Sequence, residues 1–182
     1  MGGSLANADP SAEIPLVAVL LDATMTAEGV AGTRNIKAGE FFESAMMTAL
    51  ADDECLTEIA FPVWHGARLG CGFHEVTIRD SDFALAAAAA QVELDGDGAC
   101  VRIHMAVGGA TPCPLRAGQV EDALRGTPLA DGQVRDAVAA LGDVLDPASD
   151  VHADADYRRR IACVMAARAI ASARDEAMEA AP

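Results

Sequence analysis

The chain has 182 residues, of which 52% are hydrophobic and 23% charged, so it carries enough apolar side chain for a folded core and is not a disordered chain. This length fits one domain or two small ones and excludes a large multidomain enzyme. Lys and Arg number 13 against 28 Asp and Glu, which gives a formal charge of −15. That charge argues against nucleic acid as a partner, because phosphate backbones are bound by clustered Lys and Arg.

The cysteines and the apolar runs indicate the compartment. The five cysteines are an odd number without a C-x-x-C pair, which argues against a disulfide framework or a zinc site and favours a reducing compartment. No apolar run reaches the roughly 18 residues that a membrane span needs, and the start lacks a signal-peptide pattern. We therefore expect a cytoplasmic protein without a membrane segment.

The first 61 residues predict a series of short elements. Glycines and Asp9-Pro10 favour a loop at the start, Pro10 and Glu13 favour the entry of a helix, and alternation before Pro62 is typical of a half-buried strand. In chain order, the expected elements are a loop over residues 1–10, a helix over 11–21, strands over 24–27 and 30–36 that bracket Glu28-Gly29 as a hairpin, a helical turn over 39–45 and a strand over 56–61.

The alanine-rich stretch over residues 83–94 is ambiguous. Its five consecutive alanines have a high helix propensity. However, residues 91–94 alternate in polarity, residues 95–98 (DGDG) form a strong hairpin-turn signal, and residues 101–107 alternate again. We predict two antiparallel strands, with small alanines where another element packs closely on the sheet, and a further strand over residues 73–78.

The C-terminal third predicts three helices. Two short ones, over residues 119–124 and 132–141, end at glycines. A long helix follows Asp154 and Asp156, and its last residues, 175–182, are expected to fray. Residues with apolar side chains recur in it at spacings of three to four and predict one buried stripe: Tyr157, Ile161, Val164, Met165 and Ala169. The basic residues 158–160 are interpreted as part of the helix surface, and residues 64–72 as a boundary between two lobes.

Three local patterns have both a functional and a structural interpretation. Gly2-Gly3-Ser4 could present backbone N–H groups to a phosphate, or form a flexible terminus. The cluster at residues 152–156, with one histidine and two aspartates, could bind a metal, but capping of the following helix explains it better, so we expect no metal site. His74-Glu75, beside a glycine-rich loop, is a candidate site or a solvated strand end.

Taken together, the motifs resemble a known family. The segments GGSLANADPSAEIP, GTRNIKAGEFF, LTEIAFP, GFHEVTIRDSDFALAAAAA, VGGATPCPLRA and DYRRRIACVMAARAI follow the order seen in the FAD-binding medium subunit of molybdenum hydroxylases, the xanthine dehydrogenase and carbon monoxide dehydrogenase family. The resemblance implies an α+β fold. Residues 1–66 would form the rear part of a flavin-binding domain, and residues 67–182 a three-stranded antiparallel sheet with a three-helix bundle.

The resemblance also implies site residues. Gly2, Gly3 and Ser4 match the second glycine-rich FAD motif, which contacts the phosphates and the ribityl chain. Asn7 and Glu13 match positions that hydrogen-bond the cofactor, and Leu56 matches the apolar residue that packs beside the flavin. His74 falls where some relatives carry a lysine at the flavin edge, and it is the candidate catalytic residue because histidine exchanges protons near neutral pH.

The resemblance implies a function and partners. In such enzymes the molybdenum-cofactor large subunit oxidises the substrate, the iron–sulfur small subunit relays electrons, and FAD passes them to an acceptor. Medium subunits carry a first flavin subdomain before the point where this chain starts, so we expect a truncated or split subunit that holds FAD weakly alone, in a complex or a homo-oligomer. The alternative is an FAD-free paralogue, acting as an assembly module or as a cofactor-independent enzyme in the vacated cleft.

Overall fold

The computed structural model describes residues 1–180 and has the expected α+β fold. Its helices are α1 (Gly2–Asn7), α2 (Glu13–Leu20), α3 (Ala38–Phe41), α4 (Gly118–Leu124), α5 (Asp131–Ala139), a 3₁₀ turn η1 (Ala140–Asp143) and α6 (Ala155–Glu179). Its strands are β1 (Thr24–Gly29), β2 (Gly32–Lys37), β3 (Phe42–Ser44), β4 (Met47–Thr48), β5 (Cys55–Ala60), β6 (Leu69–Thr77), β7 (Ala84–Leu94), β8 (Cys100–Gly108) and β9 (Leu115–Arg116).

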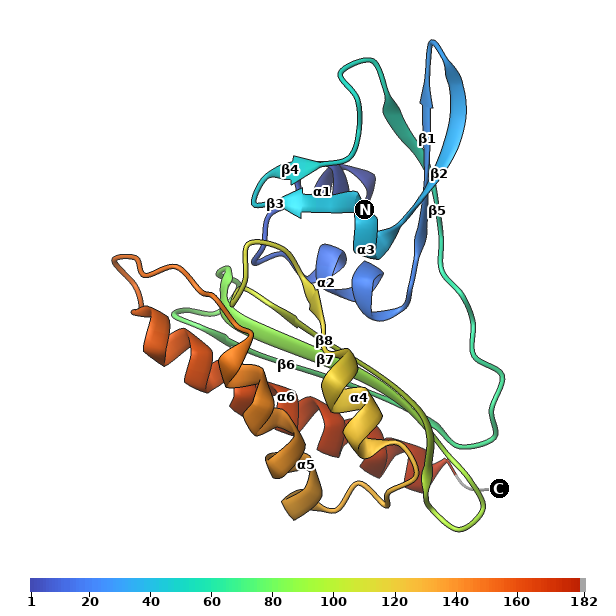
Figure 1. The fold of residues 1–182 in the computed structure, drawn as a ribbon, viewed down its shortest axis with the longest axis vertical. Helices are drawn as coiled ribbons and strands as arrows, with labels where there is room; N and C mark the ends of the chain where they lie inside the picture. The colour runs from blue at the N-terminus through green and yellow to red at the C-terminus, as the bar shows by residue number, and fades with distance from the viewer. Residues whose placement is uncertain (181–182) are drawn as a thin grey trace.

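The larger sheet is a middle layer between two sets of helices. It is antiparallel with the order β6-β7-β8-β9, so a short fourth strand adds to the three expected. α6 crosses one face against β6 and β7, with α4 and α5 beside it, and α2 contacts β7 and β8. The N-terminal elements extend from the side of the sheet opposite α6 (Figure 1).

β7 explains why an alanine run becomes a strand. All five of its consecutive alanines are buried, and the side chains alternate between two apolar clusters. Ala86, Ala88 and Ala90 belong to the C-terminal core, the cluster that includes Ile103, Met105, Met165 and Ile170. Ala87 and Ala89 belong to the N-terminal core, the cluster that includes Leu5, Leu16, Met25 and Phe41. A strand covered on both faces reads as a continuous apolar run, and tertiary packing overrides helix propensity.

Two glycines let α6 approach β6 at backbone distance. A Cβ placed on Gly70 would lie 1.9 Å from the Ala173 carbonyl oxygen, and one on Gly72 would lie 2.0 Å from that of Ala169. Both helix residues are themselves fully buried alanines. The contact therefore requires the absence of a side chain on the strand and a minimal one on the helix.

The N-terminal elements agree with the predicted ones in kind but differ in three details. The smaller sheet has the order β2-β1-β5, and its hairpin turns at residues 30–31 rather than at Glu28-Gly29, which lie within β1. The predicted turn over residues 39–45 divides into α3 and β3. The start of the chain is the short helix α1 and not a loop.

α6 differs from its prediction in which side chains are buried. Arg158, predicted on the surface, is 7% exposed, and its guanidinium donates to the Leu85 carbonyl oxygen at 2.7 Å and to Asp150 at 2.6 Å. Val164, predicted in the buried stripe, is 43% exposed. The helix continues to Glu179, so residues 175–179 are helical; residues 181–182 lie outside the described residues. Asp154 caps α6 by accepting from the Tyr157 N–H at 2.6 Å, as predicted.

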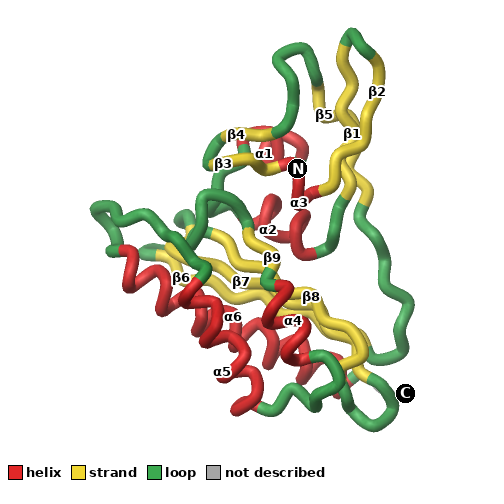
Figure 2. The backbone as a smooth tube through the Cα atoms, viewed as in Figure 1, coloured by secondary structure: helices red, strands yellow, loops and turns green. Residues whose placement is uncertain are grey.

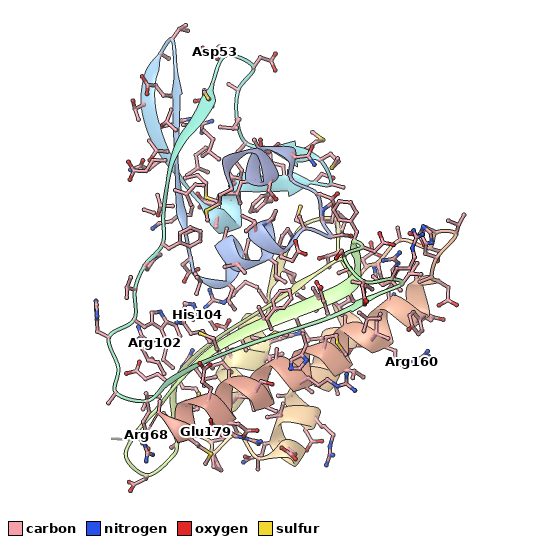
Figure 3. All side chains as sticks on the ribbon, turned by 180° about the vertical axis from the view of Figure 1, so that it is seen from behind. Asp53, Arg68, Arg102, His104, Arg160 and Glu179 are labelled. Atoms are coloured by element: carbon pink, nitrogen blue, oxygen red, sulfur yellow. The ribbon has the colours of Figure 1, made fainter. Side chains whose placement is uncertain are left out.

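A long connection without regular structure joins β5 to β6 (Figure 2), and Trp64 within it packs against β8. The indole is 8% exposed, and the Arg102 guanidinium lies 3.7 Å from its ring centroid. The His104 ring stands edge-on at 4.6 Å, and its Nδ1–H donates to the Leu20 carbonyl oxygen at 2.9 Å. Burial, together with the nearby positive charge of Arg116, lowers the pKa of His104. The labelled Arg102 and His104 are near each other in Figure 3.

Within residues 1–180, no helix combines the length and the apolar character that crossing a membrane requires.

Candidate functional site

α1 positions the glycine-rich segment. Gly2, Gly3 and Ser4 form its first turn, Leu5 is fully buried in the N-terminal core, and Ala8 ends the helix in the left-handed conformation at φ 52°. The Ser4 and Leu5 N–H groups donate to the Met1 carbonyl oxygen at 3.1 and 3.3 Å. Burial of Leu5 thus fixes the helix and leaves the two glycines at its beginning.

The two glycines leave open space around the backbone. A Cβ placed on Gly2 or on Gly3 would have no heavy atom within 4 Å, and Gly3 is exposed. Their N–H groups precede the first hydrogen bonds of the helix. The fold therefore does not require glycine at either position, and the missing side chains leave the backbone accessible to a ligand.

Asn7 and Leu56 lie on α1 and β5, two elements that contact each other. α1 packs against β4 and β5. The exposed Asn7 amide reaches the Met46 sulfur at 3.8 Å, beside β4. Leu56, on β5 opposite Ala27 of β1, is half-buried and packs against the N-terminal core. The glycine segment, Asn7 and Leu56 are thus presented by adjoining elements.

Glu13 lies at the beginning of α2, where it is exposed. Its negative charge affects Glu75 of β6. Burial is the larger cause that raises the pKa of Glu75, and the charge of Glu13 is the smaller one. Glu75 lies opposite Ala87 of β7, a residue of the N-terminal core. Directly opposite residues of paired strands share a face, so Glu75 faces the side of the sheet that carries α2. The alternation of side chains in β6 indicated that Glu75 and His74 face opposite ways, but only the packing of α2 shows which side each takes.

His74 points to the other side of the sheet. Its Nε2 lies 2.9 Å from the Ser172 hydroxyl oxygen of α6, on the face where Gly70 and Gly72 also meet α6. Successive residues of a strand alternate between faces, so Phe73 and Glu75, rather than His74, face the N-terminal elements. The structure thus separates His74 from the other predicted site residues.

Two family models match the sequence. The first 64 residues match the FAD binding domain in molybdopterin dehydrogenase, and residues 72–173 match the CO dehydrogenase flavoprotein C-terminal domain. Together the two matches include every predicted site residue.

Curated relatives match almost the whole chain. The chain is 34% identical over 174 residues to the 6-hydroxypseudooxynicotine dehydrogenase complex subunit alpha of Paenarthrobacter nicotinovorans, covering 95% of this chain and 58% of the relative. It is 32% identical to the glyceraldehyde dehydrogenase medium chain of Sulfolobus acidocaldarius, covering 93% of this chain and 59% of the relative. The chain thus spans somewhat less than two thirds of the length of these relatives.

Solved structures show the same fold. A chain of the Cu,Mo-CO dehydrogenase in its cyanide-inactivated form superposes with a TM-score of 0.92 at 32% identity and covers 97% of this chain and 61% of its own length. A chain of quinoline 2-oxidoreductase from Pseudomonas putida 86 gives a TM-score of 0.90 at 33% identity, with the same coverage of 97% and 61%.

Proposed function

This chain belongs to the CO dehydrogenase flavoprotein family, the FAD-containing medium subunits of molybdenum hydroxylases, and we propose that it supplies part of an FAD site that passes electrons from iron–sulfur clusters to an acceptor. The observation that carries the proposal is the open backbone at Gly2 and Gly3, inside the segment that matches an FAD-binding domain. Gly118 and Gly132 are equally open, so what distinguishes Gly2 and Gly3 is their place in the segment that matches an FAD-binding domain.

The chain's own residues would divide the work of binding. The Gly2 and Gly3 N–H groups would donate to phosphate oxygens, with the Ser4 hydroxyl beside them. The exposed Asn7 amide, whose NH2 group reaches the Met46 sulfur, would hydrogen-bond the cofactor through its oxygen, and Leu56 offers an apolar surface to the flavin ring. When bound, FAD supplies the electron-transfer chemistry, while the protein positions and tunes it.

Glu13 and His74 have a different standing in this proposal. We include Glu13 as a hydrogen-bond acceptor, since its carboxylate is exposed at the beginning of α2. His74 contacts Ser172 of α6. Titration of His74→Ala with FAD tests whether the imidazole also lies at the flavin edge.

The family supports the proposed partners, and the cysteines support the proposed location. The proposed partners are a molybdenum-cofactor large subunit and an iron–sulfur small subunit, because the relatives carry the names of medium chains or of subunits of dehydrogenase complexes. The proposed location is the cytoplasm: all five cysteines are free thiols, which fits a reducing compartment.

The test is a substitution that separates binding from folding. In Gly3→Ala, helix formation is favoured by about 0.5–1 kcal/mol and no clash arises, so we expect an unchanged or higher melting temperature. A methyl group between the backbone and a phosphate removes a hydrogen bond to a charged group, about 1.5–3 kcal/mol, so FAD affinity should fall about tenfold or more. Gly132→Ala, in α5 and equally free of neighbours, is the matched control.

The measurement is titration of the full chain with FAD, followed by quenching of flavin fluorescence. We expect weak FAD binding by the wild-type chain, because the residues proposed to bind FAD lie on an open surface. Equal affinity of Gly3→Ala and Gly132→Ala would contradict the role of the glycines. Absence of any binding at submillimolar FAD would contradict the FAD proposal for this chain and favour the FAD-free interaction module.

A further inference from the structure

A groove runs between α5 and α6 on the side of the C-terminal helices away from the sheet. It has a volume of about 470 Å³ and lies over Val138, Cys163 and Val164. A second hollow of about 200 Å³ shares Arg135 and Ala167 with it and extends to Arg168. The lining residues of α6 recur at spacings of three and four, so they form one continuous face of the helix.

The groove gathers arginines that lack a carboxylate partner. Eight arginines in residues 1–180 form ion pairs with Asp or Glu: Arg34, Arg79, Arg102, Arg116, Arg125, Arg158, Arg159 and Arg174. Arg135, Arg160 and Arg168 are exposed and have no carboxylate oxygen within 4.0 Å among the same residues. Arg135 and Arg160 line the groove, Arg168 lines the adjoining hollow, and Figure 3 shows Arg160 projecting from α6 away from the sheet.

Unpaired cations are unexpected on this chain. With 28 acidic residues and a charge of −15, carboxylates are available to pair most arginines, yet three form no ion pair around one apolar floor. Asp131 and Asp156, which line the same surface, pair with Arg174 and Arg159 instead, and the Arg160 guanidinium lies 5.4 Å from the Tyr157 ring centroid. The floor includes Val164, which is 43% exposed although it lies in the middle of a helix that is otherwise well packed. An apolar centre with arginines at its rim is the composition of a protein interface.

The charge distribution selects among possible occupants. The lining holds four arginines against two aspartates, Asp131 and Asp156. A second copy joined by two-fold symmetry would place this patch against itself, so that positive charge would predominate on both sides of the contact. The apolar floor offers nucleic acid no aromatic stacking surface, and an anionic membrane is distinguished from a peptide by the vesicle arm of the experiment below. An acidic protein segment with an apolar stripe satisfies both the rim and the floor.

We infer that this α5–α6 groove docks an amphipathic helix of another protein, with apolar residues at i, i+3, i+4 and i+7 and Glu or Asp along both flanks. Binding of a helix in an apolar groove is a recurring recognition mode, and opposite charges at the rim steer association and set its salt dependence. The inference is independent of FAD binding, because the groove lies on the face of α6 turned away from the sheet and the proposed FAD residues lie beyond the sheet's opposite face (Figure 1).

The probe is a fluorescein-labelled 18-residue synthetic helix. It carries Leu at positions i, i+3, i+4 and i+7 and Glu on both flanks of this apolar stripe. A matched peptide carries Gln in place of every Glu. Fluorescence anisotropy with the full chain should give saturable binding of the Glu peptide, at least about tenfold tighter than the Gln peptide at low salt and weakening as salt is added. The double variant Arg135→Glu/Arg160→Glu should reduce affinity for the Glu peptide by about tenfold or more.

The control variant is Arg68→Glu, which reverses an arginine without a carboxylate partner on the β5–β6 connection, outside the groove. It should leave the affinity unchanged, and circular dichroism melting should show that all variants remain folded. Val164→Asp, which spoils the floor without touching an arginine, should also abolish binding. Equal binding by the double variant and Arg68→Glu, or tighter binding of anionic vesicles than of the Glu peptide, would overturn the inference.

Discussion

Gly72→Ala tests whether the approach of α6 to β6 limits the stability of the fold. The added Cβ would lie 2.0 Å from the Ala169 carbonyl oxygen, whereas ordinary contacts begin at 3.4 Å, so strand and helix must separate by about 1.4 Å. The clash involves backbone, which no rotamer can relieve. Overpacking costs about 1–3 kcal/mol, and we expect the upper end, because a gap of about 1 Å already forfeits a quarter to a half of a dispersion contact.

The assay is urea and thermal unfolding followed by circular dichroism. A loss of about 3 kcal/mol corresponds to a fall in melting temperature of about 6–12 °C for a chain of this size. Gly118→Ala, where the new methyl would meet no atom within 4 Å, should change the melting temperature by only a degree or two. Ala169→Gly should not rescue Gly72→Ala, since the obstacle is the carbonyl oxygen. A melting temperature within 2 °C of the wild-type value for Gly72→Ala, or a rescue by Ala169→Gly, would refute this reasoning.

Two further predictions follow from side-chain contacts. The hydrogen bond from Arg34 lowers the pKa of Glu54 from 4.5 to about 2, so the stabilisation from this pair is present above pH 4.5 and is lost as the pH falls toward 2; a carbon-13 NMR titration measures it, and Arg34→Gln should move the pKa back up. His74→Ala removes the contact with Ser172 and should lower the melting temperature by about 2–4 °C, the effect of about 1 kcal/mol, as should Ser172→Ala. Calorimetric FAD titration should give His74→Ala the wild-type affinity, and a selective loss would place the imidazole at the flavin edge.

Most elements could be predicted from local patterns. The half-buried strand β5, the hairpin formed by β7 and β8 and the capped start of α6 all follow from alternation, turn residues or a capping aspartate. The alanine run is a strand, as predicted from the DGDG turn and the alternation on both sides of it. What propensity alone could not supply is the reason for the alanines, which is burial on both faces.

The remaining differences depend on tertiary packing. α1 forms because Leu5 enters the N-terminal core, and nothing in Gly2-Gly3-Ser4 itself favours a helix. Arg158 is buried because its guanidinium donates to the Leu85 carbonyl oxygen of β7 and to Asp150. Neither partner lies within the helix that carries Arg158, so the helical pattern alone could not predict its burial. The period-2 rule placed His74 and Glu75 on opposite faces, but the sequence carried no signal for which face α6 covers. The assignment of a side chain to a site therefore needed the three-dimensional arrangement.

β7 is a wall common to both cores, so we expect the molecule to unfold as one cooperative unit. Because the same strand completes the packing of α2 on one side and of α6 on the other, loosening either side exposes the alanines that the other side needs. Calorimetry should then give a single transition with equal calorimetric and van't Hoff enthalpies. A ligand held only by N-terminal residues would protect the amides of α6 from hydrogen exchange, since free energy gained on one side of the wall is shared by the other.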